Sequence, residues 1–380
     1  MINSTKISAE SYRFTALDIF RGLTVCFMII VNTSGNGATT FWPLKHADWN
    51  GFTPTDLVFP SFLFAVGNAM SFVMKKWETM KQSEVLWKIF KRTVLIFAIG
   101  YLMYWFPFFK LDAQSHLTLS PISQTRIFGV LQRIALCYGI VALMVYYLGT
   151  KKTIWLGVFF LVAYWALLSI FGTPGLEFSK TGNAVLRLDT WLIGVNHLYT
   201  GEGFPFDPEG LLSTLPALFN VIAGYAVGRY LQKKGKTYEG LTKLLLVGFV
   251  LLFIAYCWNS FFPVNKKLWT SSYALLTVGL DCLILSVIIY ITDFLGKTRG
   301  TYFFLVTGKN PLSIYLMSEL GVTILWMIHI GKEPLFSWLY NHIFIYSGDY
   351  LGAFLFSVWW MLTCWLVGFI MDKNKIYIRL

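Results

Sequence analysis

A polar stretch between two apolar runs carries a histidine in a setting that suggests chemistry. Residues 44–60 have the sequence LKHADWNGFTPTDLVFP, which places His46 in a loop between two expected membrane helices. An imidazole takes up and releases protons near neutral pH, so a histidine held at a membrane face is suited to proton transfer. Asp48 lies nearby in the sequence, but this pair is too sparse to indicate a metal site.

The residues that follow His46 carry the signal of a helix start. Thr53 has the residue type of a helix cap, Pro54 suits the first helical position, and Asp56 falls in the first turn. A carboxylate there interacts favourably with the positive end of the helix dipole. Ahead of the histidine, a loop rich in glycine and threonine covers residues 32–40. We therefore expect the histidine-containing loop to be held between the end of one helix and the start of the next.

The composition predicts that these helices cross a membrane. Of the 380 residues, 56% are hydrophobic and 13% are charged, whereas soluble domains average about 25% charged residues. Runs of about 20 apolar residues can span a bilayer as helices, and these runs lack the alternation of barrel strands. We predict an all-α, polytopic integral membrane protein that forms one domain over residues 1–380. The ten expected spans are residues 16–32, 57–74, 89–109, 127–148, 153–171, 210–231, 244–262, 269–291, 311–330 and 351–371.

The basic residues indicate orientation rather than a polyanionic partner. The net charge is +12, but the lysines and arginines are concentrated in alternate loops, with 20 in one set of loops and 8 in the other. This is the positive-inside pattern, so we expect both termini in the cytoplasm, His46 on the outer side, and no nucleic-acid partner. The polar residues 1–13 lack the features of a cleavable signal, so we expect the first span to be retained.

The longest expected outer loop covers residues 172–209. It mixes acidic residues with aromatic side chains such as Trp191, Tyr199 and Phe206. Acidic and aromatic side chains on an exposed loop suit the binding of a sugar or a cationic amine. The alternative is a solvated cap whose aromatic residues lie at the membrane interface.

Three further polar residues lie at expected helix starts. Asp207 and Glu209 precede the sixth span, where their charges favour a helix start through the dipole. A functional alternative is that one of these carboxylates orients His46 or binds an amine. Asn310 precedes the ninth span and either caps that helix or donates a hydrogen bond to a substrate.

Ionisable residues inside the expected spans need a reason, because each costs about 2.5–3.5 kcal/mol on insertion scales. Asp18 and Arg21 lie three residues apart on one helical face, either as an ion pair at the interface or with Arg21 facing a cavity that admits a phosphate. Arg126 and Arg133 are seven residues apart, so we expect them on one face of the fourth span, with Arg133 lining a cavity. Asp281, in the eighth span, is a candidate partner for a buried cation.

Taken together, these segments resemble the heparan-α-glucosaminide N-acetyltransferase family of transmembrane acetyltransferases. The resemblance follows the order of the chain and covers most of it. It is carried by residues 17–22, 31–32, 45–51, 56–60, 126–133, 207–210 and 308–310. Compared with the lysosomal enzyme, the sequence has no counterpart of the luminal N-terminal domain and additional first span. The resemblance therefore implies a bacterial form in the plasma membrane, which is the inner membrane if the organism is Gram-negative.

The resemblance also implies an activity and its partners. The family moves an acetyl group from cytoplasmic acetyl-CoA to the amine of glucosamine or a terminal glucosaminide on the outer side. Its essential histidine corresponds to His46, and an asparagine at the end of the preceding span corresponds to Asn32. The implied partners are acetyl-CoA as co-substrate, an amino sugar or glycan acceptor and the lipid bilayer, with a homodimer as an assembly and no metal.

This chemistry suits the residues. An ammonium is not nucleophilic, so neutral His46 either removes a proton from the acceptor amine or is itself acetylated and passes the group on. Asn32 is a neutral donor suited to the thioester oxyanion, an interaction worth about 3–4 kcal/mol in comparable sites. Arg21 and Arg133 are expected to pair with CoA phosphates in a tunnel open to the cytoplasm. The full set of expected binding residues is Asp18, Arg21, Asp56, Arg126, Arg133, Asp207, Glu209 and Asn310.

Two other functions fit the same sequence features. Ten or so helices with charges inside the membrane also suit a transporter of amino sugars or N-acetylglucosamine, and the lack of an obvious repeat weighs only mildly against it. The other alternative is O-acylation of a surface glycan or lipid. Acetyl transfer that depends on His46 would distinguish the enzyme from the carrier, and a hydroxyl-only acceptor would distinguish N-transfer from O-transfer.

Overall fold

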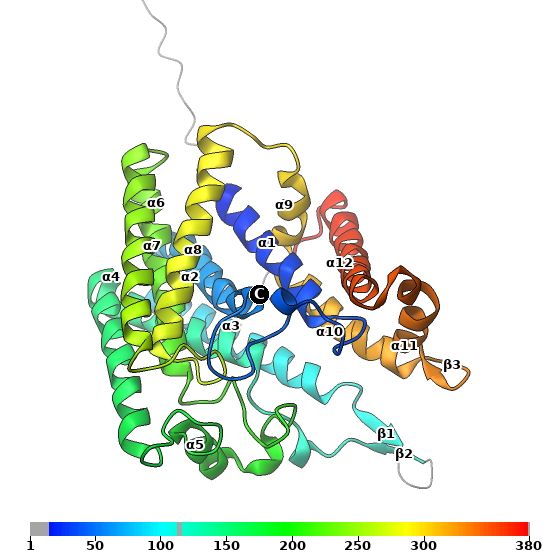
Figure 1. The fold of residues 1–380 in the computed structure, drawn as a ribbon. Coiled ribbons are helices and arrows are strands. Elements are labelled where there is room, and N and C mark those ends of the chain that lie inside the picture. Colours follow the sequence, from blue (N-terminus) through cyan, green and yellow to red (C-terminus); the bar gives the residue numbers. More distant parts are fainter. Residues whose placement is uncertain (1–14, 112–115, 379–380) are drawn as a thin grey trace, which may run out of the picture.

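The protein is a bundle of α-helices, as predicted. The computed structural model describes residues 15–111 and 116–378, and within these ranges it has twelve α-helices and two short hairpins (Figure 1). The α-helices are α1 (Thr15–Asn32), α2 (Val58–Trp77), α3 (Gln82–Trp105), α4 (Val130–Phe171), α5 (Ala184–Ile193), α6 (Thr214–Lys234), α7 (Tyr238–Asn259), α8 (Ser271–Ile289), α9 (Thr301–Lys309), α10 (Pro311–Met327), α11 (Leu335–Leu339) and α12 (Asp349–Lys373).

Shorter elements connect these helices. Antiparallel hairpins pair β1 (Phe109–Leu111) with β2 (Leu117–Leu119) and β3 (His329–Ile330) with β4 (Glu333–Pro334). The 3-10 turns are η1 (Trp42–Leu44), η2 (Pro54–Leu57), η3 (Ile122–Gln124), η4 (Val195–His197) and η7 (Ile345–Ser347), and the π turns are η5 (Tyr290–Phe294) and η6 (Tyr340–Phe344). Residues 1–13, expected to lack a cleavable signal, lie outside the described residues. So does Arg379, one of the basic residues that indicate orientation.

The expected spans coincide with helices, but their number is not established. The fourth and fifth expected spans are the two arms of α4, which are separated by a break at Gly149, where φ is 70° and ψ is 172° and a side chain would be strained. Among the described helices, α1, α2, α4, α7, α8 and α12 are long and apolar enough to cross a membrane. The helix α3 begins earlier than expected, at Gln82, and its first turns carry charged residues. The number of ten spans stays a prediction.

The interior of the bundle depends on close helix crossings. A Cβ atom on Gly67 of α2 would lie 2.0 Å from the carbonyl oxygen of Val221, and one on Gly224 of α6 would lie 2.0 Å from the carbonyl oxygen of Phe64. Because both contacts are with backbone atoms, neither helix can make room by moving a side chain. Small residues at such crossings let helix backbones pack directly against each other. The middle of α2, the helix that follows the histidine-containing loop, is thereby fixed against α6.

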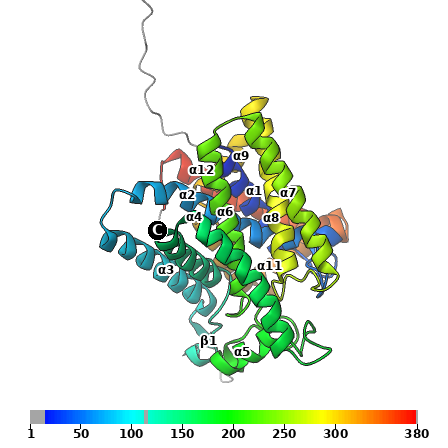
Figure 2. The same cartoon turned by 90° about the vertical axis from the view of Figure 1, so that its left-hand side faces the viewer.

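One end of the bundle carries a folded cap, and α9 lies at the other end (Figures 1 and 2). We use the name cap for residues 172–213, which include α5 and η4. The cap has its own buried cluster, in which Val185 and Phe206 pack with Phe262, Leu268 and residues of α4. The long expected loop is therefore an ordered layer rather than a loose connection.

The cap also holds the loop that contains His46. The indole nitrogen of Trp49 donates a hydrogen bond to the carbonyl oxygen of Phe178 at 2.8 Å. The ring of Trp49 meets the ring of Phe206 edge to face, with 5.5 Å between the centroids. On the other side, the amide nitrogen of Gly51 donates to the carbonyl oxygen of Val264 at 2.8 Å. These contacts fix the loop from two directions.

We expect Gly224→Ala to destabilise the protein by about 1–3 kcal/mol, because the new methyl group would overlap the backbone of α2. The measurement is the thermal unfolding midpoint of purified protein in detergent. Gly37→Ala is the matched control, since a Cβ atom there would meet nothing within 4 Å. Equal midpoints for the two variants would contradict the close crossing of α2 and α6.

Candidate functional site

A histidine and a buried aspartate form the centre of the site. The carboxylate oxygen Oδ1 of Asp56 lies 2.7 Å from Nδ1 of His46. The other oxygen, Oδ2, accepts hydrogen bonds from the backbone nitrogens of Thr53 (2.9 Å) and Ala47 (3.2 Å) and from the Thr53 hydroxyl (3.0 Å). The helix start predicted at Thr53 is confirmed, since η2 begins at Pro54. This turn fixes the carboxylate, and the carboxylate orients the imidazole.

The contact with Asp56 assigns the protons of the imidazole. An ionised carboxylate only accepts hydrogen bonds, so Nδ1 of His46 carries the hydrogen and Nε2 keeps its lone pair. The side chain of Asp56 is 1% exposed, whereas that of His46 is 43% exposed and lines a cavity. The arrangement therefore presents a basic nitrogen to a space that a ligand can enter.

A lysine lies against the same ring. The ammonium nitrogen of Lys266, in the segment before α8, is 3.0 Å from Nε2 and 3.1 Å from Nδ1 of His46. Burial lowers the pKa of His46 below its ordinary value, and the positive charge of Lys266 lowers it further, while Asp56 opposes both effects. Burial also lowers the pKa of Lys266. His46 is therefore neutral at pH 7, as a base must be.

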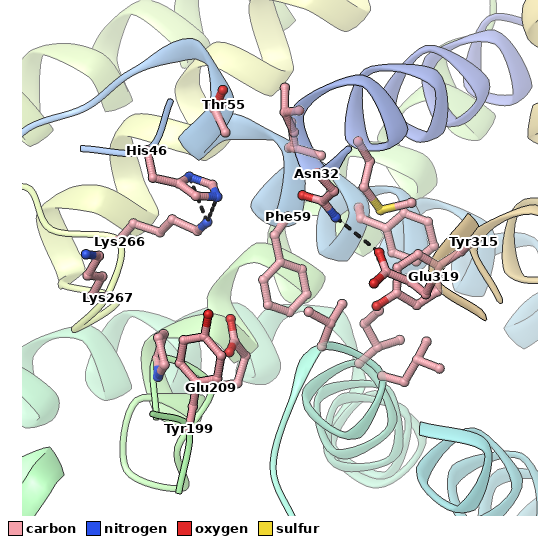
Figure 3. A pocket seen from close by; sticks show the side chains of 18 of the residues that line it. Asn32, His46, Thr55, Phe59, Tyr199, Glu209, Lys266, Lys267, Tyr315 and Glu319 are labelled. Atoms are coloured by element: carbon pink, nitrogen blue, oxygen red, sulfur yellow. Dashed lines mark hydrogen bonds between the residues drawn. The ribbon is translucent and has the colours of Figure 1, made fainter. Parts of the chain in front are cut away.

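The cavity beside His46 has a volume of about 350 Å³ and lies where α1, α2, α3, α4 and α10 meet the loops before α6 and α8. Figure 3 shows two polar pairs on opposite sides of it, His46 with Lys266 and Asn32 with Glu319, and the ring of Phe59 between them. The lining residues are Met28, Val31, Asn32, His46, Thr55, Val58, Phe59, Phe62, Tyr104, Arg126, Val130, Leu131, Ile134, Tyr199, Glu202, Pro208, Glu209, Lys266, Lys267, Tyr315 and Glu319.

Asn32, the last residue of α1, reaches this cavity. Its amide nitrogen donates to Oε1 of Glu319 on α10 at 3.3 Å. Since a carboxylate accepts and does not donate, this contact assigns the nitrogen of the Asn32 amide to the side of Glu319. The amide has a second N–H group that can serve a ligand. The expected placement of Asn32 and His46 in one site therefore agrees with the geometry.

The expected acidic pair does not contact His46. Asp207 and Glu209 instead bind Arg126, whose Nη2 lies 2.7 Å from Asp207 Oδ1 and 2.6 Å from Glu209 Oε2. The guanidinium also lies against the rings of Tyr104 and Tyr199, at 4.9 Å and 4.6 Å from their centroids. Arg126 and Glu209 line the cavity. The role predicted for one of these acids, orienting His46, belongs to Asp56.

The expected placement of Arg126 and Arg133 on one helical face is wrong. The helix α4 begins at Val130, so Arg126 lies in the segment before it. Arg133 is fully buried, where it donates to the carbonyl oxygen of Gly210 at 2.9 Å and to the hydroxyl of Ser213. It is absent from the cavity lining, because these contacts turn it toward the start of α6.

Asp281 is not the partner of Arg133. Its Oδ1 accepts a hydrogen bond from the hydroxyl of Ser61 on α2, and its Oδ2 has no hydrogen-bond partner among the described residues. Arg133 instead finds uncharged partners, including the ring of Trp269 at 4.9 Å from the guanidinium carbon. Nε and Nη1 of Arg133 have no hydrogen-bond partner among the described residues, so backbone, hydroxyl and aromatic groups satisfy this buried cation only in part.

Three expected binding residues lie away from this cavity. Asp18 and Arg21 contact each other at 2.7 Å in α1, on the part of that helix that crosses α9. Asn310 bonds to the C-terminal segment, donating to the carbonyl oxygen of Ile376 at 2.9 Å and accepting from the amide of Ile378 at 3.1 Å. Asn310 therefore holds a backbone segment rather than lining the cavity near His46.

Sequence reasoning missed Lys266 and Glu319. Glu319 is a carboxylate inside an expected span, so the criterion that selected Asp281 should have selected it as well. Lys266 had no such signal, because its segment contacts the histidine-containing loop only after folding. Among the described residues, no group of three or more His, Cys, Asp or Glu side chains is placed to hold a metal ion.

We expect opposite changes in the pKa of His46 when its two charged neighbours are neutralised. Lys266→Met removes a cation that disfavours the imidazolium and should raise the pKa. Asp56→Asn removes an anion that favours the imidazolium and should lower the pKa. The measurement is NMR titration of protein labelled with ¹⁵N-histidine.

Lys267→Met is the matched control for Lys266→Met. The ammonium of Lys267 bonds to the carbonyl oxygen of Asp48 and to Glu202 rather than to the ring of His46. Its removal should shift the titration less than the removal of Lys266. A pKa of His46 that stays constant in both Lys266→Met and Asp56→Asn would contradict this electrostatic arrangement.

Comparison with known proteins identifies the family. The family model described as heparan-alpha-glucosaminide N-acetyltransferase, catalytic, matches residues 13–254. The chain is 28% identical over 367 residues to the Mus musculus protein named heparan-alpha-glucosaminide N-acetyltransferase, and 29% identical over 373 residues to the Homo sapiens protein of that name. These matches cover 82% and 83% of this chain, which spans about half, 54%, of each relative. The matched family model covers more than half of the chain, and the protein therefore belongs to the heparan-α-glucosaminide N-acetyltransferase family.

Proposed function

We propose that the protein transfers an acetyl group from acetyl-CoA to the amine of glucosamine or of a terminal glucosaminide. The observation that carries this proposal is the pair His46 and Asp56, which presents an unprotonated Nε2 to a cavity. The names of the mouse and human relatives support both the acetyl group and the amino-sugar acceptor. Cavities of about 300–1,000 Å³ are typical of small-ligand sites, and this one falls within that range.

In the direct route, His46 acts as the general base. The acceptor ammonium gives one proton to Nε2, and its nitrogen then attacks the carbonyl carbon of the thioester. A carbon–nitrogen bond forms, the carbon–sulfur bond breaks, and the leaving thiolate takes a proton from the imidazolium. The regenerated neutral imidazole then accepts the second proton, which the new amide nitrogen loses, and releases it to water. Asp56 stabilises the imidazolium between these steps through its contact with Nδ1.

In the alternative route, His46 carries the acetyl group. Nε2 attacks the thioester, and CoA leaves as a thiolate, which takes one proton from the acceptor ammonium. The resulting amine displaces the imidazole from the acetyl carbon, and the freed Nε2 accepts the second proton from the amide nitrogen and releases it to water. Both routes need the same tautomer, with Nδ1 protonated against Asp56 and Nε2 unprotonated, and both require the acceptor or the thioester to displace the Lys266 ammonium from Nε2. The acetyl-histidine intermediate is therefore compatible with this geometry, as is direct transfer.

Two donors are placed to stabilise the charge that develops on the thioester oxygen. The free N–H group of Asn32 and the ammonium of Lys266 line the cavity from opposite sides (Figure 3). A carbonyl group bound between them would gain hydrogen bonds as its oxygen becomes negative, which lowers the barrier to attack. Lys266 would then act in two ways, because the same charge keeps His46 neutral.

A second cavity supports delivery of the donor along α1. It has a volume of about 310 Å³ and is lined mainly by apolar side chains of α1, α2, α8, α9 and α12. Along α1 its lining runs from Phe20 to Ile30, whereas the first cavity is lined from Met28 to Asn32, and Val58 lines both. We propose that an elongated donor enters near α9. We also propose that this end of the bundle, like both chain termini, lies on the cytoplasmic side of a bacterial plasma membrane.

His46→Ala should lower the formation of N-acetylglucosamine by about 10²–10⁴-fold, because the general base or acetyl carrier is lost. The measurement is mass spectrometry of products from purified protein, acetyl-CoA and glucosamine. His342→Ala is the control, since His342 is exposed and its Nδ1 bonds to the carbonyl oxygen of Trp338, outside the cavity. Uptake of unmodified glucosamine by cells that is insensitive to His46→Ala would instead indicate a transporter.

Asn32→Ala should lower kcat by about 10²–10³-fold, the usual effect of removing one oxyanion donor. The KM for acetyl-CoA should change little, because the donor acts mainly on the transition state. Asn36→Ala is a control from the loop that follows α1, since the Asn36 side chain accepts a hydrogen bond from the backbone nitrogen of Ala38 at 3.0 Å and is absent from the cavity lining. An unchanged kcat in Asn32→Ala would remove Asn32 from the mechanism.

A further inference from the structure

Not every carboxylate that lines the cavity has a cationic partner. Three of its lining residues are carboxylates: Glu202, Glu209 and Glu319. Glu202 pairs with Lys267, and Glu209 pairs with Arg126 at 2.6 Å. Glu319 has no ion-pair partner among the described residues, and the single hydrogen bond of its carboxylate there is with the uncharged amide of Asn32. One carboxylate therefore faces the cavity without a cation.

An unpaired carboxylate in this position is costly. Glu319 lies in α10, an apolar helix, and its side chain is only partly exposed. Removing a charge from water without a partner is unfavourable, so residues of this kind usually meet a charge or a ligand. The rings of Phe59, Tyr104 and Tyr315 line the same cavity, and Figure 3 shows Tyr315 beside Glu319. Aromatic faces attract cations and offer nothing to anions.

We propose that Glu319 binds the ammonium group of the acceptor and thereby makes the cavity selective for amines over hydroxyl-only acceptors. A primary ammonium has three N–H donors, so it can bond to the carboxylate while its remaining faces meet aromatic rings. A hydroxyl group in its place would leave the carboxylate without a counter-charge, which is the kind of loss that gives strong discrimination. This inference rests on the proposed function only in naming the amine as that of the acceptor.

The position of Glu319 agrees with this role. Asn32 joins Glu319 to the end of α1, and His46 lies across the cavity from this pair (Figure 3). An ammonium bound to Glu319 therefore extends from the Glu319 side into the cavity that Nε2 of His46 also faces, and its N–H groups that do not bond to the carboxylate remain available to that nitrogen. The carboxylate binds the amine, and the imidazole or its acetylated form acts on it.

The test compares two ligands that differ by one group. Glucosamine and glucose are titrated separately into the purified full-length protein without acetyl-CoA, and binding is measured by calorimetry. We expect glucosamine to bind at least tenfold more tightly than glucose at pH 7. Glu319→Gln should remove this difference, because glutamine keeps an oxygen that accepts from Asn32 but carries no charge. Equal binding of the two sugars to the unsubstituted protein would overturn the proposal without any variant.

Steady-state kinetics provide a second measurement, because a purely structural role of Glu319 would not change the KM for glucosamine selectively. In Glu319→Gln the KM for glucosamine should rise at least tenfold, while the KM for acetyl-CoA stays within twofold. Glu333→Gln is the matched control, since Glu333 is a partly exposed carboxylate in β4 of the hairpin after α10 and lies outside the cavity lining. An unchanged KM for glucosamine in Glu319→Gln, or equal increases for both substrates, would overturn the proposal.

The two proposals can fail separately. If the protein binds glucosamine through Glu319 but forms no acetylated product, the proposed function fails and the ammonium site stands. If the protein acetylates glucosamine and Glu319→Gln does so with the same KM, the function stands and the ammonium site fails.

Discussion

The hydrogen bond between Asp56 and His46 is the contact on which the rest of the site depends. It sets the tautomer of the ring, and it exists because one turn of 3-10 helix places a buried carboxylate against the preceding loop. Backbone and hydroxyl groups of Ala47 and Thr53 satisfy the second oxygen. The turn in turn leads into α2, whose close crossing with α6 leaves little freedom of position. The packing of α2 against α6 therefore also fixes the position of Asp56 and, through it, of Nδ1 of His46.

Most charged side chains around the cavity lie next to a side chain of the opposite charge, and they do not form a patch of one sign. Burial and the charge of Lys266 both lower the pKa of His46, whereas Asp56 opposes them, so the ring is neutral at neutral pH and its protonated form still has a carboxylate partner. Arg126 is held by two carboxylates and two aromatic rings, which leaves it little capacity for a phosphate. Glu319 differs from the other carboxylates that line the cavity, because it has no cationic partner among the described residues. A positively charged ligand would provide that partner.

Local signals in the sequence predicted local structure. The helix start at Thr53 and the all-α class follow from neighbouring residues and from composition, and both were correct. Contacts across the fold were harder. Nothing near Lys266 in the chain indicates that its segment lies against His46, and the spacing of Arg126 and Arg133 suggested a shared face only because the helix was expected to start too early. The free-energy cost of placing an ionisable side chain inside a membrane indicates that the side chain needs a partner, but it does not indicate which residue that partner is.

The anchoring of Trp49 to the cap has a mechanical consequence. The indole bonds to the backbone of Phe178 and packs on Phe206, three residues along the chain from the imidazole. Any displacement of the cap is therefore passed directly to the short segment that contains His46. If the protein acetylates amino sugars as proposed, an acceptor large enough to contact the cap would change the position of the imidazole, whereas a free monosaccharide would not.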